Sequence, residues 1–355
     1  MNREETRMAE TNWSSLGYLV YKRTYARKLD PFLGADSPTE EFEDTIERVL
    51  DACREQLQCN FTDEEEDRLR HYWINLKSSV AGRFLWQLMS DTVADHGLGS
   101  LQNCAGTLVD EPIRPFVWTM DMLMLGAGVG YNIQRRYVNK LPEVTPWFKP
   151  PERFDDGGAD YIVPDSREGW VKLLGKTLKA AFLSDSPESG FFNYSTQVIR
   201  PAGSVIKKFG GTASGPEHLV WGINEIAKIL YKRRGDKLTP VDCLDIMNII
   251  GAVVVSGNVR RSAQLAIGDP DDVEYLMAKR WDLGNIPSWR AMSNNSVAAN
   301  NIHEIHSEFW EGYKRNPDGS AKGECYGLIN LELSRKVGRL GETEYPDPGV
   351  VVYNP

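Results

Sequence analysis

The chain has 355 residues, 41% of them hydrophobic, so it can bury a large core in one big domain or in two domains of ordinary size. Its formal net charge of -9 and its pI near 5.3 argue against binding to nucleic acid or to a membrane surface, because no long segment presents a basic field. Residues 1–13 lack the apolar stretch of a signal peptide, and the longest nearly uncharged run, 246–257, is too short to cross a bilayer. We therefore expect a cytoplasmic protein with neither nucleic acid nor membrane among its partners.

The five cysteines of the chain are Cys53, Cys59, Cys104, Cys243 and Cys325. They form no Cys-x-x-Cys pair and no zinc-binding spacing, and an odd number in a long chain argues against a disulfide scaffold. Any cysteine chemistry is therefore expected to be catalytic or redox.

Two helix-start signals predict that the first hundred residues are largely helical. The sequence Ser-Pro-Thr-Glu at 37–40 precedes apolar side chains that recur at steps of three and four over 42–57, which indicates an amphipathic helix. Cys53 lies on the apolar face of this helix and is most simply a core residue. Thr62, followed by four acidic residues at the positive end of a helix, leads into a second helix around 68–76.

From Leu101 onward the pattern changes to an α/β organisation without detectable repeats. Short apolar runs broken by glycines alternate with predicted helices at 115–124, 240–255, 270–281 and 304–313. Residues 142–187 are rich in proline, glycine and aspartate, which is typical of an insertion with long surface loops.

Two motifs near the start of this α/β part are candidates for chemistry. In residues 101–109, Cys104 enters a β-prone apolar run directly after a polar loop, although a free cysteine in such a run is more often a small buried hydrophobe. In Gly-Ala-Gly-Val-Gly at 126–130, the alternating glycines allow the backbone to approach another backbone or a phosphate closely. This is not the dinucleotide-binding fingerprint, and each signal is weak by itself.

Three further polar segments lie downstream. The loop 207–216 could hold phosphate oxygens through main-chain N–H groups, and a plain surface loop explains it equally well. Residues 256–263 place two arginines on a glycine-hinged loop before a predicted strand, which suits contacts to anions or nucleobases, whereas paired arginines are often merely solvated. The amide and hydroxyl cluster at 289–297 is more typical of a turn. His303 and His306 have no third candidate ligand at a sequence spacing typical of metal sites, so we predict no metal site there.

The order and spacing of these segments resemble those of the monomeric adenosylcobalamin-dependent (class II) ribonucleoside-triphosphate reductases. The resemblance covers the chain from about Tyr25 onward and weakens inside the insertion. It rests on Asn103-Cys104, the glycines at 126–130, Phe-Gly-Gly-Thr-Ala-Ser-Gly-Pro at 209–216, Gly-Asn-Val-Arg-Arg-Ser-Ala at 257–263 and the Ser-Asn-Asn-Ser-Val segment at 293–297.

The resemblance implies a fold and a division into regions. Residues 1–100 would form an N-terminal, mainly helical region, and 101–355 the first half of the ten-stranded α/β barrel of the ribonucleotide reductase and glycyl-radical type. An insertion at about 134–200 would help to build an effector site. The N-terminal ATP-binding cone of some relatives is expected to be absent.

The resemblance also implies an activity, which is the reduction of ribonucleotides, with ribonucleoside triphosphates as the expected substrates, to 2′-deoxyribonucleotides for DNA synthesis. Adenosylcobalamin would start the thiyl-radical chemistry. Cys104 matches the first of the two reducing cysteines, so it would cycle between thiol and disulfide and be recharged by a thioredoxin-like reductant. Its partner cysteine would lie downstream of the end of this chain.

Binding residues follow from the same resemblance. Asn103, Gly128 and Gly130 match residues at the substrate. A deoxynucleoside triphosphate (dNTP) effector would bind near Asp121 and act on the substrate base through a loop, by differential affinity for loop conformations. That loop consists of Gly257, Asn258, Val259, Arg260, Arg261 and Ser262.

The chain ends at Asn354-Pro355, which matches the start of the family's Asn-Pro-Cys-Gly-Glu motif. Asn354 would orient substrate there, whereas the radical cysteine, the glutamate base, the second reducing cysteine and most of the cobalamin surface would belong to a C-terminal half. We therefore expect this chain to be inactive alone and to need that half as a partner. Cys325, which lies upstream of the motif, is interpreted as structural. An intein-interrupted gene, a split gene and an incomplete sequence would each explain the end point.

Two alternatives remain open. The chain could be a nucleotide-binding remnant that keeps the effector site and has lost catalysis. It could also be a fragment of a class I large subunit, which takes its radical from a metal-bearing partner. The insertion and the Gly-Asn-Val-Arg-Arg sequence at 257–261 disfavour the second alternative.

Overall fold

The computed structural model describes residues 11–204, 212–256 and 263–337. The chain forms two compact units, divided between Asn103 and Cys104. None of the helices in the described ranges is long and apolar enough to span a membrane.

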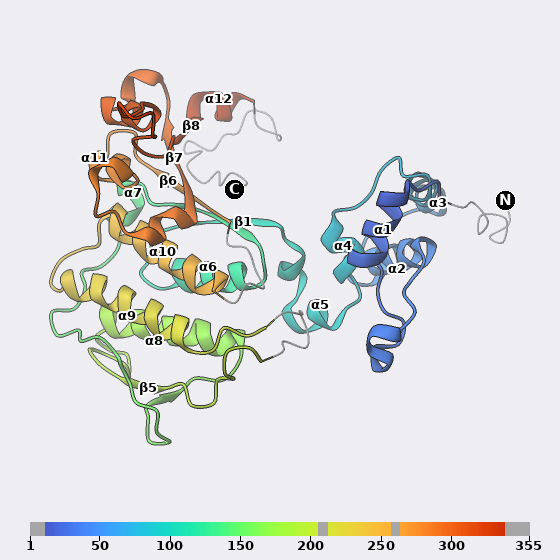
Figure 1. The fold of residues 1–355 in the computed structure, drawn as a ribbon, viewed down its shortest axis with the longest axis horizontal. Helices are drawn as coiled ribbons and strands as arrows, with labels where there is room; N and C mark the ends of the chain where they lie inside the picture. The colour runs from blue at the N-terminus through green and yellow to red at the C-terminus, as the bar shows by residue number, and fades with distance from the viewer. Residues whose placement is uncertain (1–10, 205–211, 257–262, 338–355) are drawn as a thin grey trace. The chain divides into compact units, whose positions relative to one another are not determined.

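The first unit is built from helices and the loops between them (Figure 1). Its elements are α1 (Ser15–Thr24), the 3-10 helix η2 (Pro31–Asp36), α2 (Phe42–Glu55), α3 (Asp63–Ile74), α4 (Gly82–Gln87), α5 (Asp91–His96) and the 3-10 helix η3 (Leu98–Leu101). The two helices predicted here are confirmed. Thr62 caps α3 by accepting a hydrogen bond from the Glu65 N–H, while the Glu65 side chain accepts the Thr62 N–H.

The helices α2 and α3 contribute to the core of the first unit. Ile46, Val49 and Cys53 of α2 are buried and pack in one apolar cluster with Trp73 and Ile74 of α3. The prediction that Cys53 is a core residue is confirmed, since only 7% of its surface is exposed.

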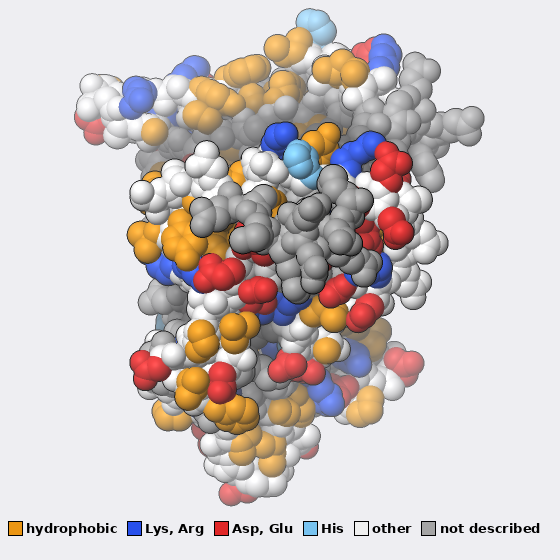
Figure 2. Space-filling view, turned by 90° about the vertical axis from the view of Figure 1, so that its right-hand side faces the viewer, with side chains coloured by type: hydrophobic (Ala, Val, Ile, Leu, Met, Phe, Trp, Pro, Cys, Tyr) orange, Lys and Arg blue, Asp and Glu red, His pale blue; other side chains and the backbone are white. Residues whose placement is uncertain are grey.

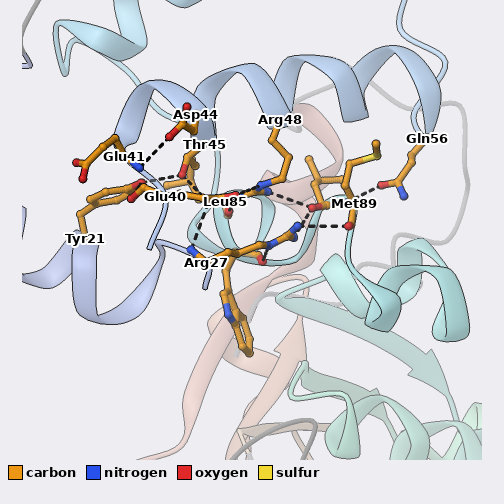
Figure 3. Close-up of polar contacts among 12 residues, drawn as sticks. Tyr21, Arg27, Glu40, Glu41, Asp44, Thr45, Arg48, Gln56, Leu85 and Met89 are labelled. Carbon is orange, nitrogen blue, oxygen red and sulfur yellow. Dashed lines mark hydrogen bonds and ion pairs between the residues drawn. The ribbon is translucent and has the colours of Figure 1, made fainter. Parts of the chain in front are cut away.

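A buried carboxylate ties the start of α2 to the segment after α4 (Figure 3). Glu40 is 5% exposed and accepts hydrogen bonds from Arg48 Nε at 2.7 Å, Arg48 Nη2 at 2.8 Å and the Thr45 hydroxyl at 2.8 Å. Arg48 also donates to the carbonyl oxygens of Leu85 at 2.8 Å and Leu88 at 3.1 Å. The guanidinium thus connects α2 to α4 and to Leu88 directly after it, about forty residues away in sequence.

Arg27 completes this cluster from a third segment. Its Nε donates to the Trp86 carbonyl at 2.8 Å, and its backbone N–H donates to Glu40 at 3.3 Å. Burial alone would raise the pKa of Glu40, but the hydrogen bonds from Arg48 and Thr45 outweigh burial and hold that pKa below its ordinary value. The cluster therefore stabilises the unit only while Glu40 is ionised.

One face of the molecule mixes charges of both signs. On the face shown in Figure 2, acidic and basic side chains lie interspersed around apolar ones. That face presents no continuous basic field.

The second unit contains a five-stranded sheet in the order β1-β2-β6-β7-β8, and every neighbouring pair in it is parallel. The strands are β1 (Cys104–Leu108), β2 (Gly128–Asn132), β6 (Gln264–Gly268), β7 (Ser293–Ala299) and β8 (Gly327–Asn330). The α/β fold class is thereby confirmed. Whether these strands are half of a ten-stranded barrel stays a prediction.

Two layers of helices cover one side of this sheet (Figure 1). The inner layer, α6 (Arg114–Met124) and α10 (Pro240–Val255), contacts the strands, and the outer layer, α8 (Arg167–Phe182) and α9 (Glu217–Lys232), packs on the inner one. Beyond them lies a small parallel sheet, ordered β3 (Glu152–Arg153), β5 (Asn193–Ser195) and β4 (Tyr161–Ile162). The shorter helices of the unit are α7 (Arg135–Val138), α11 (Val273–Met277), α12 (Leu331–Lys336) and the 3-10 helices η4 (Trp281–Leu283), η5 (Ser288–Met292), η6 (Ile302–Glu304) and η7 (Ser307–Tyr313).

The apolar helix α10 sits at the centre of this packing. It begins at Pro240 as predicted, with Thr239 and Asp242 forming a capping box. Its approach to α9 depends on Gly222, because a Cβ atom there would lie 2.2 Å from Cγ2 of Val253. The bounds predicted for this helix, 240–255, are confirmed.

Three sequence predictions need correction. The stretch 142–187 contains α8, a 16-residue helix that buries leucines such as Leu173 and Leu178, so it is not only loops. Its prolines and aspartates lie outside the helix, which contains two of the glycines, Gly169 and Gly175. The helix predicted at 270–281 is reduced to α11 and η4, and most of the one predicted at 304–313 is the 3-10 helix η7.

Substituting Glu40 by Gln should lower the free energy of unfolding by about 3 kcal/mol at neutral pH, because it leaves the Arg48 guanidinium buried without its carboxylate. Urea denaturation measures this loss. The difference from wild type should be complete above the unfolded-state pKa of about 4.3 and should shrink as the pH falls through the lower folded-state pKa. The control, Glu64→Gln, removes an exposed partner of Arg68 and should cost less than about 0.5 kcal/mol. Equal losses in the two variants would contradict the assignment.

Candidate functional site

The predicted reducing cysteine stands at the amino edge of the five-stranded sheet. Cys104 is the first residue of β1 and pairs with Gly128, the first residue of β2. Asn103 directly precedes it and is exposed. Because the strands are parallel, their amino ends meet along one edge. The structure therefore places Cys104 and Gly128 side by side, with Gly130 one step further along the same face.

The two faces of the sheet differ in chemistry. Val129, Tyr131 and Ala266 point into the core beneath the inner helices. By the alternation of strand residues, Cys104, Gly106, Gly128, Gly130 and Asn294 lie on the opposite side, together with Leu265. We call this side the glycine face.

The glycine face combines a thiol with a strip that lacks side chains. Gly106 and Asn294 are exposed, Cys104 is partly exposed, and Gly128 and Gly130 are buried. Gly130 pairs with Gly106 on one side and with Leu265 on the other. Missing side chains let a ligand approach the backbone next to the thiol. This arrangement suits a small molecule that must bring a reactive atom to Cys104.

Cys243, the cysteine in helix α10, is completely closed to solvent. Burial raises the pKa of its thiol well above the ordinary value. Cys325 is exposed and its thiol lies 3.8 Å from the Gly312 carbonyl oxygen, two residues before β8. Cys104 is the cysteine that the sheet itself positions.

A buried ion pair holds the start of β7. Asp245 of α10 is 8% exposed and accepts two hydrogen bonds from Arg290, from Nε and from Nη2, each at 2.7 Å. It also accepts one from Trp289 Nε1 at 2.9 Å. Burial alone would lower the pKa of Arg290, but Asp245 outweighs it and raises that pKa. The pair fixes η5 on α10, and therefore also the point where β7 begins.

A buried lysine adds a second restraint at the same place. Lys279 has a fully buried side chain that donates to the Ser293 carbonyl oxygen and, at 2.5 Å, to Glu324. Burial lowers the pKa of Lys279, and Glu324 opposes that effect. Asn295, on the helix-covered face, donates to the Tyr326 hydroxyl at 3.2 Å. Sequence reasoning missed these residues, because it interpreted 289–297 as a turn and no local pattern links Lys279 to Glu324.

The predicted effector residues are only partly described. Gly257, Asn258, Val259, Arg260, Arg261 and Ser262 lie outside the described residues, as do Asn354 and positions 209–211 of the 209–216 motif. The carbonyl oxygen of the flanking Ala263 accepts the Val129 N–H at 2.9 Å, so Ala263 lies at the amino edge of the sheet. Asp121 lies near the end of α6 and forms an ion pair with Arg167 at the start of α8.

Comparison with known proteins identifies the class to which this geometry corresponds. Residues 145–230 match the family model described as "B12-dependent ribonucleotide reductase, insertion domain". A crystal structure of a B12-dependent (class II) ribonucleotide reductase is similar to 96% of this chain, with a TM-score of 0.73 and 27% sequence identity, and 53% of that chain is covered. The fold is thus that of a class II ribonucleotide reductase over the matched region.

The curated relatives that match this chain are reductases of the same class. The chain is 32% identical over 93% of its length to the adenosylcobalamin-dependent ribonucleoside-triphosphate reductase of Lactobacillus gasseri and covers 50% of that protein. It is 32% identical over 97% of its length to the reductase of the same name from Levilactobacillus brevis, of which it covers 52%. The resemblance inferred from the sequence is confirmed, and the chain spans about half the length of the curated relatives it matches.

Substituting Asp245 by Asn should lower the free energy of unfolding by about 3 kcal/mol, because the Arg290 guanidinium stays buried without its carboxylate. Guanidinium chloride denaturation measures the loss. Glu332→Gln is the matched control, since it removes an exposed carboxylate paired with Lys336 and should cost less than about 0.5 kcal/mol. An unchanged Asp245→Asn protein would show that the pair does not hold β7.

Proposed function

We propose that this chain supplies one half of an adenosylcobalamin-dependent ribonucleoside-triphosphate reductase, which converts ribonucleotides to 2′-deoxyribonucleotides in the cytoplasm. The observation that carries the proposal is the position of Cys104 beside Gly128 at the amino edge of the sheet, in a chain 32% identical to a reductase of that name. Because this chain covers only about half of each of these relatives, we infer that a second half completes the site. The relatives named here are cobalamin-dependent enzymes, which disfavours a class I large subunit.

Cys104 would act as a reductant at the ribose. Its thiol and a second thiol from the other half would each give up one hydrogen atom and become joined in a disulfide. The C2′–O bond breaks, one hydrogen leaves with the 2′-hydroxyl as water, and the other forms the new C2′–H bond. A thioredoxin-like dithiol would then reduce this disulfide by exchange. The partial exposure of Cys104 supports both roles, because it must meet first the substrate and then a reductant.

Most of the cofactor site would belong to the second half of the enzyme. Within the described ranges, no three His, Cys, Asp or Glu side chains come together as a metal site. A hollow of about 410 Å³ lies on the insertion and is lined by Trp147, Lys149, Glu152, Ser189, Gly190 and Phe191, away from the thiol-bearing sheet. Adenosylcobalamin would generate the initiating radical when bound, and we assign none of these residues to it.

The glycine face would carry the nucleotide. With the ribose at Cys104, the base would reach across Gly130 and Leu265 toward Asn294, which lies three strands away, on the order of 15 Å. The exposed Asn294 amide can both donate and accept hydrogen bonds, as the edge of a nucleobase requires. We therefore place the base at the amino ends of β6 and β7.

Effector control would act on the same edge of the sheet. Ala263, which directly follows Gly257–Ser262 in sequence, is hydrogen-bonded to β2, so this segment would act on the space next to the base. A dNTP near Asp121 would favour one loop conformation through differential affinity. The Arg167 ion pair gives Asp121 a partner that a bound triphosphate could compete for.

Asn294→Ala should alter base discrimination. In the protein completed with the second half of a Lactobacillus relative, loss of an amide contact to the base should lower kcat/KM for the affected nucleotide roughly 5- to 150-fold, or about 1–3 kcal/mol. The control is Asn295→Ala, which faces the helices and should reduce stability without changing the ratios among the four nucleotides. Unchanged ratios in Asn294→Ala would exclude this placement of the base.

Cys104→Ser tests the proposed reaction itself. The completed protein should form deoxynucleotides continuously with adenosylcobalamin and a dithiol, and Cys104→Ser should reduce continuous turnover to background. Cys325→Ser should keep the activity, since Cys325 precedes β8, which lies at the opposite end of the sheet from β1. Absence of turnover in the completed wild-type protein, or sustained turnover without Cys104, would contradict the proposal.

A further inference from the structure

Two cysteines outside the proposed site meet at the end of α2. The helix ends at Glu55, and the chain then reverses through Gln58, which adopts a left-handed conformation with φ 55°. The reversal brings Cys59 back to the helix, where its N–H donates to the Cys53 carbonyl oxygen at 2.8 Å. The backbones of Cys53 and Cys59 are therefore held together by a direct hydrogen bond.

This hydrogen bond sets the separation that a disulfide needs. Standard bond lengths around a 2.8 Å contact keep the two Cα atoms roughly 5–7 Å apart, which is the range that disulfides span. Both side chains also belong to the same apolar cluster. The Cys59 thiol lies close enough that, after burial, it is the next cause of the raised pKa of Cys53.

The two thiols differ in access. Cys53 is 7% exposed, whereas Cys59 is partly exposed at the surface end of the turn. A soluble oxidant can therefore reach Cys59 first, and Cys53 is placed behind it to resolve the intermediate. This order of access allows Cys59 to react first and Cys53 to act second.

We propose that Cys53 and Cys59 form a reversible intramolecular disulfide, a redox site separate from Cys104. Cys59 as thiolate would attack a low-molecular-weight disulfide, forming a mixed disulfide and releasing one thiol. Cys53 as thiolate would then attack the Cys59 sulfur and release the second thiol. The two protein thiols are oxidised, the small disulfide is reduced to two thiols, and the two protons pass to the thiols released.

The bond would restrain a junction of the first unit. The turn that it closes includes Gln56, whose side-chain oxygen accepts the Met89 N–H at 3.1 Å. Met89 follows α4 and lies in the segment that Arg27 also binds. Oxidation would therefore fix the contact between the end of α2 and this segment.

The test uses the full chain, folded, with oxidised glutathione, followed by alkylation and peptide mapping. A peptide joined through Cys53 and Cys59 should form without denaturant in the wild type and equally in Cys104→Ser, and dithiothreitol should remove it. Cys53→Ala should instead trap glutathione on Cys59, because no thiol remains to resolve it. Cys59→Ser, altered at the partly exposed position, should leave Cys53 unmodified and the melting temperature of the reduced chain unchanged.

Two results would overturn the proposal. One is a wild-type chain that accumulates glutathione on Cys59 with no joined peptide. The other is a joined peptide that forms only after unfolding in urea, which would show that the folded turn holds the thiols apart. Circular dichroism on each variant establishes that the compared chains are folded.

Discussion

The parallel pairing of β1 with β2 is the constraint on which the rest of the site depends. Its register sets Cys104 against Gly128, and the same register carries across β6 to β7. Because all amino ends meet at one edge, the thiol, the glycine strip, Ala263 and Asn294 lie along that edge although they are far apart in sequence. A shift of one residue in this pairing would turn Cys104 toward the helices.

Buried charges on the helix-covered side of the sheet stabilise this register. The inner helices α6 and α10 fill the space beneath the sheet, and α10 presents Asp245 to Arg290 just before β7. Lys279 binds the Ser293 carbonyl oxygen and Glu324, which precedes β8. Such pairs add little to net stability compared with apolar packing, but breaking one is costly, so they favour a single arrangement of the strand ends.

Helices and strands whose signals lie within a few residues in sequence were predicted well. The capping box at Thr239 and the apolar run after it gave the bounds of α10, and the β-prone run at Cys104 gave β1. The helix α8 was missed because its flanks are rich in turn residues. Asp245 and Arg290 could not be paired, since they are 45 residues apart and only the packing of η5 on α10 joins them. The predicted roles of Asn103, Gly128, Gly130 and Asp121 remain predictions.

The most direct test of the account is a single turnover of the completed protein with adenosylcobalamin and excess ribonucleoside triphosphate, but without any external reductant. Cys104 is proposed to supply reducing electrons, so product should stop at about one deoxynucleotide per chain, and Cys104 should be lost from the free thiols in step with product. Formation of deoxynucleotide with Cys104 still fully reduced would contradict the central claim, since the electrons would then come from elsewhere.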